Sequence, residues 1–337
     1  MLTCRRELPE RDKMSQTAWT FLHAGDSHMG TARSYRFRPA INRRWAAIKR
    51  QMAAIDADLL LHGGDLTRDG DTHQFEYLQA REDLDTLPFP SFVIPGNMDV
   101  GNKHATQNGR KPKWEERGLG WNDPDLNMTE KRLRLFATYF GPIHWTMLHR
   151  DVRFTGFFAA VAGTGLAQEE RLWRMLERLP DLPRAKHHVA VMHYWPFMEQ
   201  PDEPAWDLTQ ADEYDNWYFS IDPPHRQRLW KAMQVARVEI LFCGHVHTGR
   251  PVQWVDDIRV YRTQAAGNTG QLAERWPDAD TRFGFHRCDV SASGIDIQFV
   301  PGDDQCGEFG TFGPLGHPSV AQRDYSVALE PPPLKPD

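Results

Sequence analysis

Hydrophobic runs and amphipathic stretches alternate along the first hundred residues. Residues 19–24 (WTFLHA) form a short apolar run that ends in the polar sequence GDSH, and two later runs, DADLLLH and SFVIP, end in GGD and GNMD. Between the first two runs, hydrophobic residues recur at intervals of 4, 3, 4 and 3, at Ile41, Trp45, Ile48, Met52 and Ile55. This spacing is typical of one helical face. The pattern predicts strand, helix (about 40–56), strand, helix (about 75–84) and strand.

The same alternation continues toward the C-terminus. A short helix around Phe136 precedes a strand near 152–158, and the sequence QEERLWRMLERL predicts a further helix. Buried-type strands at 187–193 and 238–247 each end at histidines. Alternating strands and helices predict βαβ units and a largely parallel sheet, in which the polar residues after the strands gather along one edge.

Two segments lack any hydrophobic period, residues 101–128 and 198–222, and we interpret them as long loop insertions in a single domain that spans 17–300. Beyond residue 250, four segments alternate apolar and polar residues between turn signals: VQWVDD, IRVYRTQ, GFHRCDVS and GIDIQFV. They predict antiparallel strands that complete a second sheet.

The composition is that of an ordinary globular protein. It disfavours two classes, a nucleic-acid-binding protein and a disulfide-rich protein. The 337 residues include 40 basic and 46 acidic ones, a net charge of −6, without the basic stripe of a nucleic-acid-binding protein. Four widely spaced cysteines, with no CxxC pair, exclude a disulfide scaffold and a cysteine zinc site.

The two ends of the chain lack the hydrophobic pattern of the predicted domain. Residues 1–16 have charges but no apolar core of signal-peptide length, and we predict a flexible leader in which Met1 and Met14 are both open as the start. Residues 301–337 predict an irregular tail. No stretch approaches the roughly 20 apolar residues of a membrane span, so a cytoplasmic location is expected.

Potential metal ligands follow five of the predicted strands. All are oxygen or nitrogen donors, which suit manganese, iron or zinc better than copper(I) or an iron–sulfur cluster. Seven ligands are too many for one tetrahedral zinc, but they suffice for two ions if one carboxylate bridges them, and such a pair can clamp an in-line phosphoryl displacement. The seven are Asp26, His28, Asp65, Asn97, His193, His245 and His247.

In this order, the motifs resemble those of the calcineurin-like metallophosphoesterase superfamily: DxH (GDSH), GDxx (GGDLTR), GNxD (GNMD), a strand-end histidine (VMH) and GHxH (GHVH). The resemblance covers about residues 17–300. A strand, GTG and the helix QEERLWRMLERL before the fourth motif make it most similar to the cyclic-nucleotide and glycerophosphodiester phosphodiesterase group. It implies a four-layer α/β/β/α sandwich, with two mixed sheets flanked by helices.

The resemblance also implies a role for each ligand. Asp26, His28 and His247 would hold one metal, and Asn97, His193 and His245 the other, with Asp65 as the bridge. Asp65 and Asn97 would hold the catalytic hydroxide between the ions and the second metal. The cofactors implied are two transition metals, manganese or iron, with zinc as an alternative.

The sequence departs from the family at the residue after Asn97, where a histidine that can protonate the leaving group is common and Met98 stands here. A thioether cannot donate a proton. The proton would then come from a metal-bound water or from another histidine (His62, His104 or His225), unless the leaving group needs none. We expect Met98 to narrow the substrates toward diesters or activated esters.

Further substrate contacts are expected near the motifs. Asp99 and Tyr194 are candidates together with Met98, although Asp99 could equally be a satisfied loop carboxylate. The aromatic stretch 206–219 could form a lid with stacking surfaces, or could merely anchor its loop. Its acidic residues disfavour a highly anionic substrate.

The leading hypothesis is a di-metal phosphodiesterase that acts on a small-molecule phosphoester. The alternatives are a phosphomonoesterase or nuclease of the same superfamily, and, in a different class, a non-catalytic scaffold on a retained metal site. Nucleic acid is disfavoured as a partner by the charge balance. The seven intact ligands disfavour the scaffold, because a scaffold would be free to lose them.

Overall fold

The computed structural model describes residues 18–31, 34, 39–104, 126–208, 210–268, 270 and 272–303. Its strands form two sheets. The five-stranded sheet has the order β11 (Gly294–Pro301), β10 (Gly284–Ser291), β1 (Trp19–Ala24), β2 (Leu59–His62) and β3 (Ser91–Val93). The six-stranded sheet has the order β4 (His144–His149), β5 (Val152–Phe157), β6 (His187–Met192), β7 (Ile240–Cys243), β9 (Ile258–Arg262) and β8 (Gln253–Val255).

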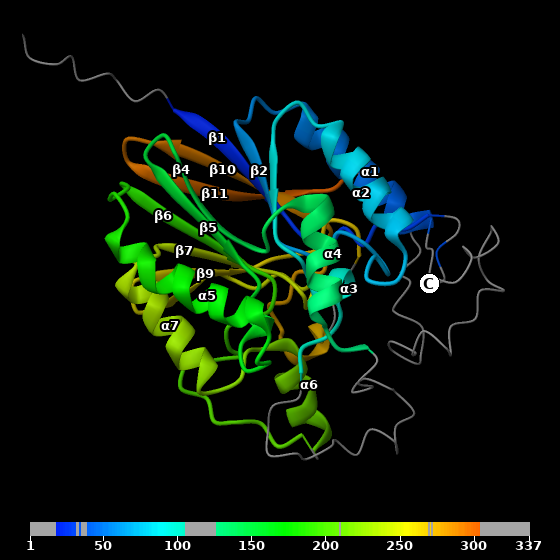
Figure 1. Ribbon diagram of the computed structural model, residues 1–337. Coiled ribbons are helices and arrows are strands. Elements are labelled where there is room, and N and C mark those ends of the chain that lie inside the picture. Colours follow the sequence, from blue (N-terminus) through cyan, green and yellow to red (C-terminus); the bar gives the residue numbers. More distant parts are fainter. Residues whose placement is uncertain are drawn as a thin grey trace, which may run out of the picture.

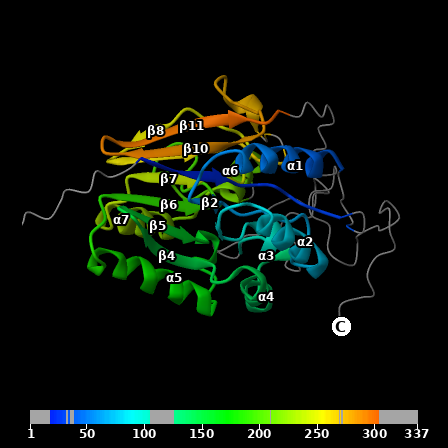
Figure 2. The same ribbon diagram turned by 90° about the horizontal axis from the view of Figure 1, so that it is seen from above.

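Helices cover the outer faces of the sheets. The helices of the described residues are α1 (Pro39–Ala53), α2 (Gln74–Asp85), α3 (Asn97–Val100), α4 (Glu130–Phe140), α5 (Ala167–Arg178), α6 (Ala211–Phe219) and α7 (His225–Val235), with short 3-10 turns at Ala159–Val161, Leu179–Asp181 and Ala273–Arg275. Figure 1 shows α1 and α2 on the side of the five-stranded sheet and α5 and α7 on the side of the six-stranded sheet. In the view from above in Figure 2, the strands of the two sheets overlie one another.

Alternation along the strands builds two hydrophobic layers. Phe21 of β1 and Leu61 of β2 meet Phe154, Val191 and Phe242 of the opposite sheet in the core between the sheets. The alternate residues of the strands face the helices in a second hydrophobic layer, as the two-residue period of a strand requires. The predicted four-layer sandwich is confirmed.

Parallel pairing brings strand ends together. In one sheet β1, β2 and β3 are parallel, and in the other β5, β6, β7 and β9 are parallel. The loops after β1, β2, β6 and β7 therefore leave the sheets at corresponding ends. This parallel pairing is the reason why the polar residues after the strands gather along one edge, as predicted.

Some predicted elements differ from the observed ones. The edge strand β4 was not predicted, because its residues are half-buried and show no clear alternation. The strands beyond residue 250 do not all complete one second sheet: β8 and β9 join the six-stranded sheet, whereas β10 pairs antiparallel with β1 of the other sheet. Alternation marks a strand, but it does not state which partner the strand takes.

The first insertion and the ends are only partly described. The predicted leader (1–16), residues 105–125 of the first insertion and residues 304–337 of the predicted tail lie outside the described residues. The second insertion, predicted as loop, contains the helix α6. Within the described part of the chain, no helix has the length and apolar character required to cross a bilayer.

Candidate metal centre

The loops after four parallel strands, together with the start of α3, carry the seven candidate ligands. Asp26 and His28 follow β1, Asp65 follows β2 and Asn97 is the first residue of α3. The histidines at 193, 245 and 247 follow β6 and β7. All seven are at most 4% exposed, so the structure brings every predicted ligand into one buried region.

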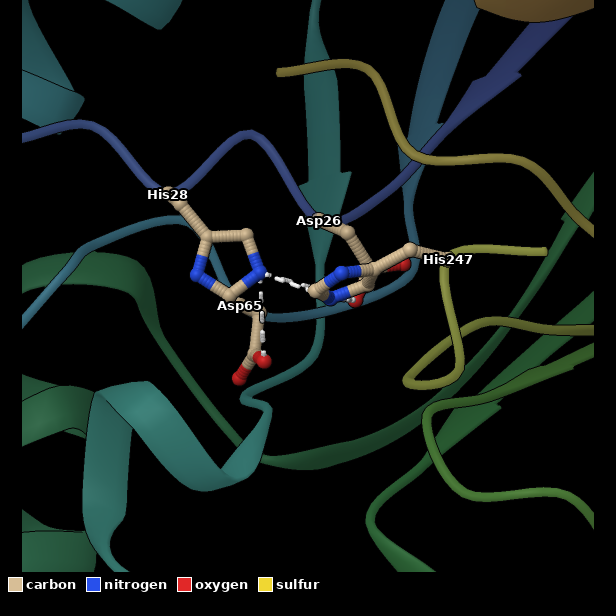
Figure 3. Close-up of side chains that lie close together, drawn as sticks. All are labelled: Asp26, His28, Asp65 and His247. Atoms are coloured by element: carbon tan, nitrogen blue, oxygen red, sulfur yellow. Dashed lines mark hydrogen bonds and ion pairs between the residues drawn. The ribbon is translucent and has the colours of Figure 1, made fainter. Parts of the chain in front are cut away.

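Their ligand atoms form two groups that share one carboxylate. Asp26, His28, Asp65 and His247 present atoms that lie within 4.8 Å of one another, and Asp65 forms a second such group with His193 and His245. Figure 3 shows the four side chains of the first group directed toward one another from three loops.

Short distances join the members of each group. In the first group, Nε2 of His28 lies 2.9 Å from Nε2 of His247 and 3.6 Å from Oδ2 of Asp65 (Figure 3). In the second, Nε2 of His193 lies 3.4 Å from Oδ2 of Asp65 and 3.2 Å from Oδ1 of Asn97. Asn97 therefore adds an amide oxygen to the second group.

The backbone at these residues is unusual. Among the described residues, nine other than glycine have positive φ, and five of the nine are candidate ligands, with φ from 47° to 71°: Asp26, His28, Asp65, His245 and His247. This conformation costs an L-residue roughly 1–2 kcal/mol. Strained backbone concentrated at one cluster is typical of a functional site, where the surrounding structure enforces the conformation.

Burial and the mixture of charges shift the pKa values of the cluster in opposite directions. Burial favours the neutral form of His193, but the carboxylates of Asp65 and Asp26 outweigh it and raise its pKa to about 9. Burial also raises the pKa of Asp26, yet the neighbouring His247 holds it below its usual value. Burial, with His193 and His247 nearby, lowers the pKa of His245. The two carboxylates thus favour positive charge at the centre of the site.

This donor set fits two metal ions. Carboxylate oxygens and imidazole nitrogens are the usual ligands of zinc, manganese and iron. The Nε2 atoms of His28 and His247 lie only 2.9 Å apart, beside the carboxylates of Asp26 and Asp65. The shared Asp65 is placed as a bridge would have to be.

Hydrogen bonds from the backbone hold the carboxylates in place. Oδ1 of Asp65 accepts from the amide of Met98 at 2.8 Å, and Oδ1 of Asp26 accepts from the amide of His245 at 3.1 Å. Asp99 is fully buried and accepts from the amides of Leu66, Thr67 and Gly96, at 3.2, 2.9 and 2.8 Å. Asp99 therefore ties the loop of Asp65 to the start of α3.

Other predicted substrate contacts are also buried. Met98 is 3% exposed, and Tyr194 is wholly buried, with its ring centroid 4.2 Å from that of His245. Tyr194 therefore packs against a candidate ligand. A contact of either residue with substrate stays a prediction.

The three histidines considered as proton donors have different places. Nε2 of His62 lies 3.1 Å from the hydroxyl of Ser27, and burial lowers its pKa to about 4, which keeps it neutral. Nε2 of His104 pairs with the carbonyl of Met128. His225 begins α7 and stacks on Trp173.

Sequence reasoning missed two residues that contact the candidate ligands. The side-chain amide nitrogen of Asn97 donates to Oδ1 of Asn102 at 3.2 Å and to the hydroxyl of Tyr218 in α6 at 3.3 Å. The carbonyl of Tyr218 accepts from Nε2 of His245 at 3.2 Å. The aromatic character of 206–219 was the available signal, but it pointed to a lid. Tyr214, Trp217, Tyr218 and Phe219 are instead at most 6% exposed, which favours the anchoring alternative.

Comparison with known proteins identifies the family. No protein in the set of curated sequences matches the chain. Among solved structures, GAP50, "the anchor in the inner membrane complex of Plasmodium", is 13% identical with a TM-score of 0.51, and 85% of each chain is covered. Purple acid phosphatase PPD1 from yellow lupin (Lupinus luteus) seeds is 16% identical with a TM-score of 0.55; the match covers 86% of this chain and 52% of that one, about half its length. At these identities the likeness shows a shared fold. The sequence profile described as calcineurin-like phosphoesterase matches residues 20–249, and the chain therefore belongs to the calcineurin-like phosphoesterase family.

Proposed function

We propose that this protein is a two-metal hydrolase of phosphoester bonds that acts on a small-molecule phosphodiester. The observation that carries the proposal is the Asp65 carboxylate, which belongs to two buried ligand groups at once. Two ions held close together by one bridging carboxylate can stabilise both the attacking and the leaving oxygen of a phosphoryl displacement. Family membership supports the same class of reaction.

In this proposal each ligand keeps the role that the family resemblance implies for it. Asp26, His28 and His247 would hold one ion, and Asn97, His193 and His245 would hold the other, with Asp65 shared. When bound, the two ions supply a lowered pKa of water and positive charge beside the phosphoryl oxygens. Manganese or iron is proposed, with zinc as the alternative, from the carboxylate and imidazole donors.

The remaining residues of the site position these groups. The amide of Met98 holds Oδ1 of Asp65 and leaves Oδ2 to face His28 and His193. The carbonyl of Tyr218 accepts from Nε2 of His245, which directs the other ring nitrogen away from that contact.

The preference for diesters rests on Met98. A buried thioether takes the place where the family commonly has a proton donor, so departure of a poorly stabilised alkoxide gains no help from this side chain. Activated esters and diesters with good leaving groups suffer least from that loss. A scaffold function is the second candidate, because the structural neighbour GAP50 is an anchor.

The experiment compares bis(p-nitrophenyl) phosphate with p-nitrophenyl phosphate on protein stripped of metal and reconstituted with manganese, iron or zinc. We expect two ions per chain by elemental analysis and faster turnover of the diester. The variant Asp65→Asn should lose bound metal and turnover together. A protein that binds none of these metals would contradict the hydrolase. Bound metal without turnover of either ester would favour the scaffold, and a faster monoester reaction would contradict the diester preference.

Met98→His tests the reason for that preference. We expect the variant to increase monoester turnover relative to diester turnover, because an imidazole can protonate an alkoxide. An unchanged ratio, in a variant that still binds two metals, would remove Met98 as the cause.

A further inference from the structure

A row of polar side chains lies on the outer face of the six-stranded sheet, where a sandwich normally buries apolar ones. Val152 and Phe154 point into the core between the sheets, so their neighbours Arg153 and Thr155 face the other way. The hydroxyl of Thr155 pairs with Nε2 of His188 on β6 at 2.9 Å and donates to Thr146 on β4 at 3.1 Å.

Arg153 brings a positive charge into this row. It is 7% exposed. Its guanidinium donates to the carbonyl of Pro183 at 2.8 Å and to the hydroxyl of Thr146 at 3.4 Å, and both acceptors are neutral. No carboxylate among the described residues forms an ion pair with it. The guanidinium also lines a cavity, so a negative group in that cavity can reach it.

A cavity opens beside Arg153. Its volume is about 320 Å³, and the ends of β6, α7 and the turn after α5 line it. Three more basic residues line it, Arg184, Lys186 and Arg237, and none of them has an ion pair within the described part of the chain. Arg184 and Arg237 are exposed at its rim.

Among the described residues that line the cavity, the one acidic side chain is already paired with a histidine. Oε2 of Glu239 lies 2.8 Å from Nδ1 of His187. The other ring nitrogen of His187, Nε2, is buried and has no hydrogen-bond partner among the described residues. Four basic side chains against one carboxylate give the lining a charge of +3 with the histidines neutral, on a chain whose net charge is −6.

We infer that this cavity, which we call the basic pocket, binds the phosphate group of a small molecule or free phosphate. A phosphate monoester carries about −1.5 to −2 charges near neutral pH, so it matches several unpaired basic groups better than a monocarboxylate does. Arginine presents two parallel N–H groups to such an oxyanion. The volume lies at the lower end of small-molecule sites, which excludes a macromolecule inside the pocket.

The basic pocket is separate from the metal centre. His188 lies near the start of β6, whereas His193 follows its last residue, and five residues of strand span roughly 16 Å. The inference therefore does not rest on the proposed hydrolase function.

Equilibrium dialysis of radiolabelled inorganic phosphate at constant ionic strength tests the inference. The full chain is used with Asp65→Asn and without added metal, because this variant should hold no metal ions that would themselves bind phosphate. We expect one phosphate per chain in this background. Adding Arg153→Gln to this variant should weaken phosphate binding by about tenfold or more, because the guanidinium in the cavity is lost.

A matched control and a second variant keep the test decisive. Arg178→Gln makes the same change of charge on an exposed residue outside the lining and should leave phosphate affinity unchanged. If Arg153→Gln fails to fold, the double variant Arg184→Gln, Lys186→Gln alters only exposed side chains and should still weaken binding severalfold. Absence of phosphate binding in the Asp65→Asn chain would overturn the inference, as would equal affinity in these variants.

Competition with glycerol 3-phosphate distinguishes the two sources of the phosphate group. Displacement of the label at lower concentration than unlabelled phosphate would identify an ester as the occupant. Displacement by unlabelled phosphate alone would identify the inorganic ion.

Discussion

Glycines beside the ligands decide how closely the ligand-bearing loops approach one another. A Cβ on Gly244 would overlap the carboxylate of Asp26, and a Cβ on Gly96 would overlap that of Asp65. Gly25 is also adjacent to Asp26, but a Cβ there would meet only ordinary contacts with Gly63, at 3.6–3.8 Å. The absence of a side chain is thus required at Gly244 and Gly96, and not at Gly25.

We predict that Gly244→Ala lowers manganese affinity by about tenfold or more, because the new methyl group displaces the Asp26 carboxylate. Isothermal titration of the metal-free protein with manganese measures the effect. Gly25→Ala is the matched control and should titrate like the wild type. Equal affinities in both variants would show that the Asp26 loop can shift without loss of binding.

Tyr218 is not a candidate ligand, but it contacts two members of the second ligand group, Asn97 and His245. Its hydroxyl lies 3.3 Å from the amide nitrogen of Asn97, and its carbonyl accepts from His245. A contact that orients a metal ligand typically contributes 10- to 100-fold to metal affinity.

Tyr218→Phe removes the hydroxyl and keeps the carbonyl, so we expect affinity for the second manganese ion to fall by about tenfold while the first remains. The two steps of a calorimetric titration separate these ions. Tyr139→Phe removes a hydroxyl that contacts Gln74 at the surface and serves as the control. Equal weakening of both steps would assign Tyr218 a general structural role.

At the scale of elements, α6 packs the second insertion, which was predicted as a loop, into the hydrophobic core. Trp217 is 1% exposed, its indole nitrogen donates to Asp222 at 2.9 Å, and the Lys103 ammonium lies 4.3 Å from its ring centroid. Lys103 in turn donates to the carbonyl of Ser220 at 2.6 Å. These contacts fix α6 to the segment that follows α3, and so place Tyr218 beside Asn97.

Trp217→Ala should therefore lower the free energy of unfolding by about 3–5 kcal/mol, because a large buried ring is removed. Urea unfolding followed by circular dichroism measures this change. Trp254→Ala removes the same side chain where it is 67% exposed and should change stability by less than about 0.5 kcal/mol. A similar small effect at both positions would mean that α6 opens as a lid in solution.

At the scale of the whole molecule, buried histidines make stability depend on pH. Burial lowers the pKa of His144, His188 and His286 to about 4 each. In the unfolded chain these side chains take up a proton near pH 6.5. Between pH 6.5 and 4 the unfolded state therefore binds more protons, and the free energy of unfolding falls as the pH falls.

The variant His286→Leu isolates one of these contributions. His286 lies between the sheets among aromatic rings, with its centroid 5.5 Å from that of Phe299. We predict a weaker fall of stability between pH 6.5 and 4 than in the wild type, by about 1.4 kcal/mol for each unit of the lost pKa shift. Urea midpoints of the metal-free protein at several pH values give both curves. Parallel curves would show that His286 binds protons equally in the folded and unfolded states.

The sequence by itself determined the βαβ order, the strand ends and the seven candidate ligands. Each of these depends on local patterns, since a buried strand followed by glycine and a ligand residue is written in consecutive positions, as in Gly25–Asp26 and Gly64–Asp65. The tertiary structure decided that β10 pairs with β1, that the aromatic insertion folds as α6 and that Tyr218 contacts Asn97 across 121 residues. It also placed Arg153 beside the basic pocket with no ion pair to a carboxylate of the described residues. Such pairings depend on which surfaces meet after collapse, and no local period encodes them.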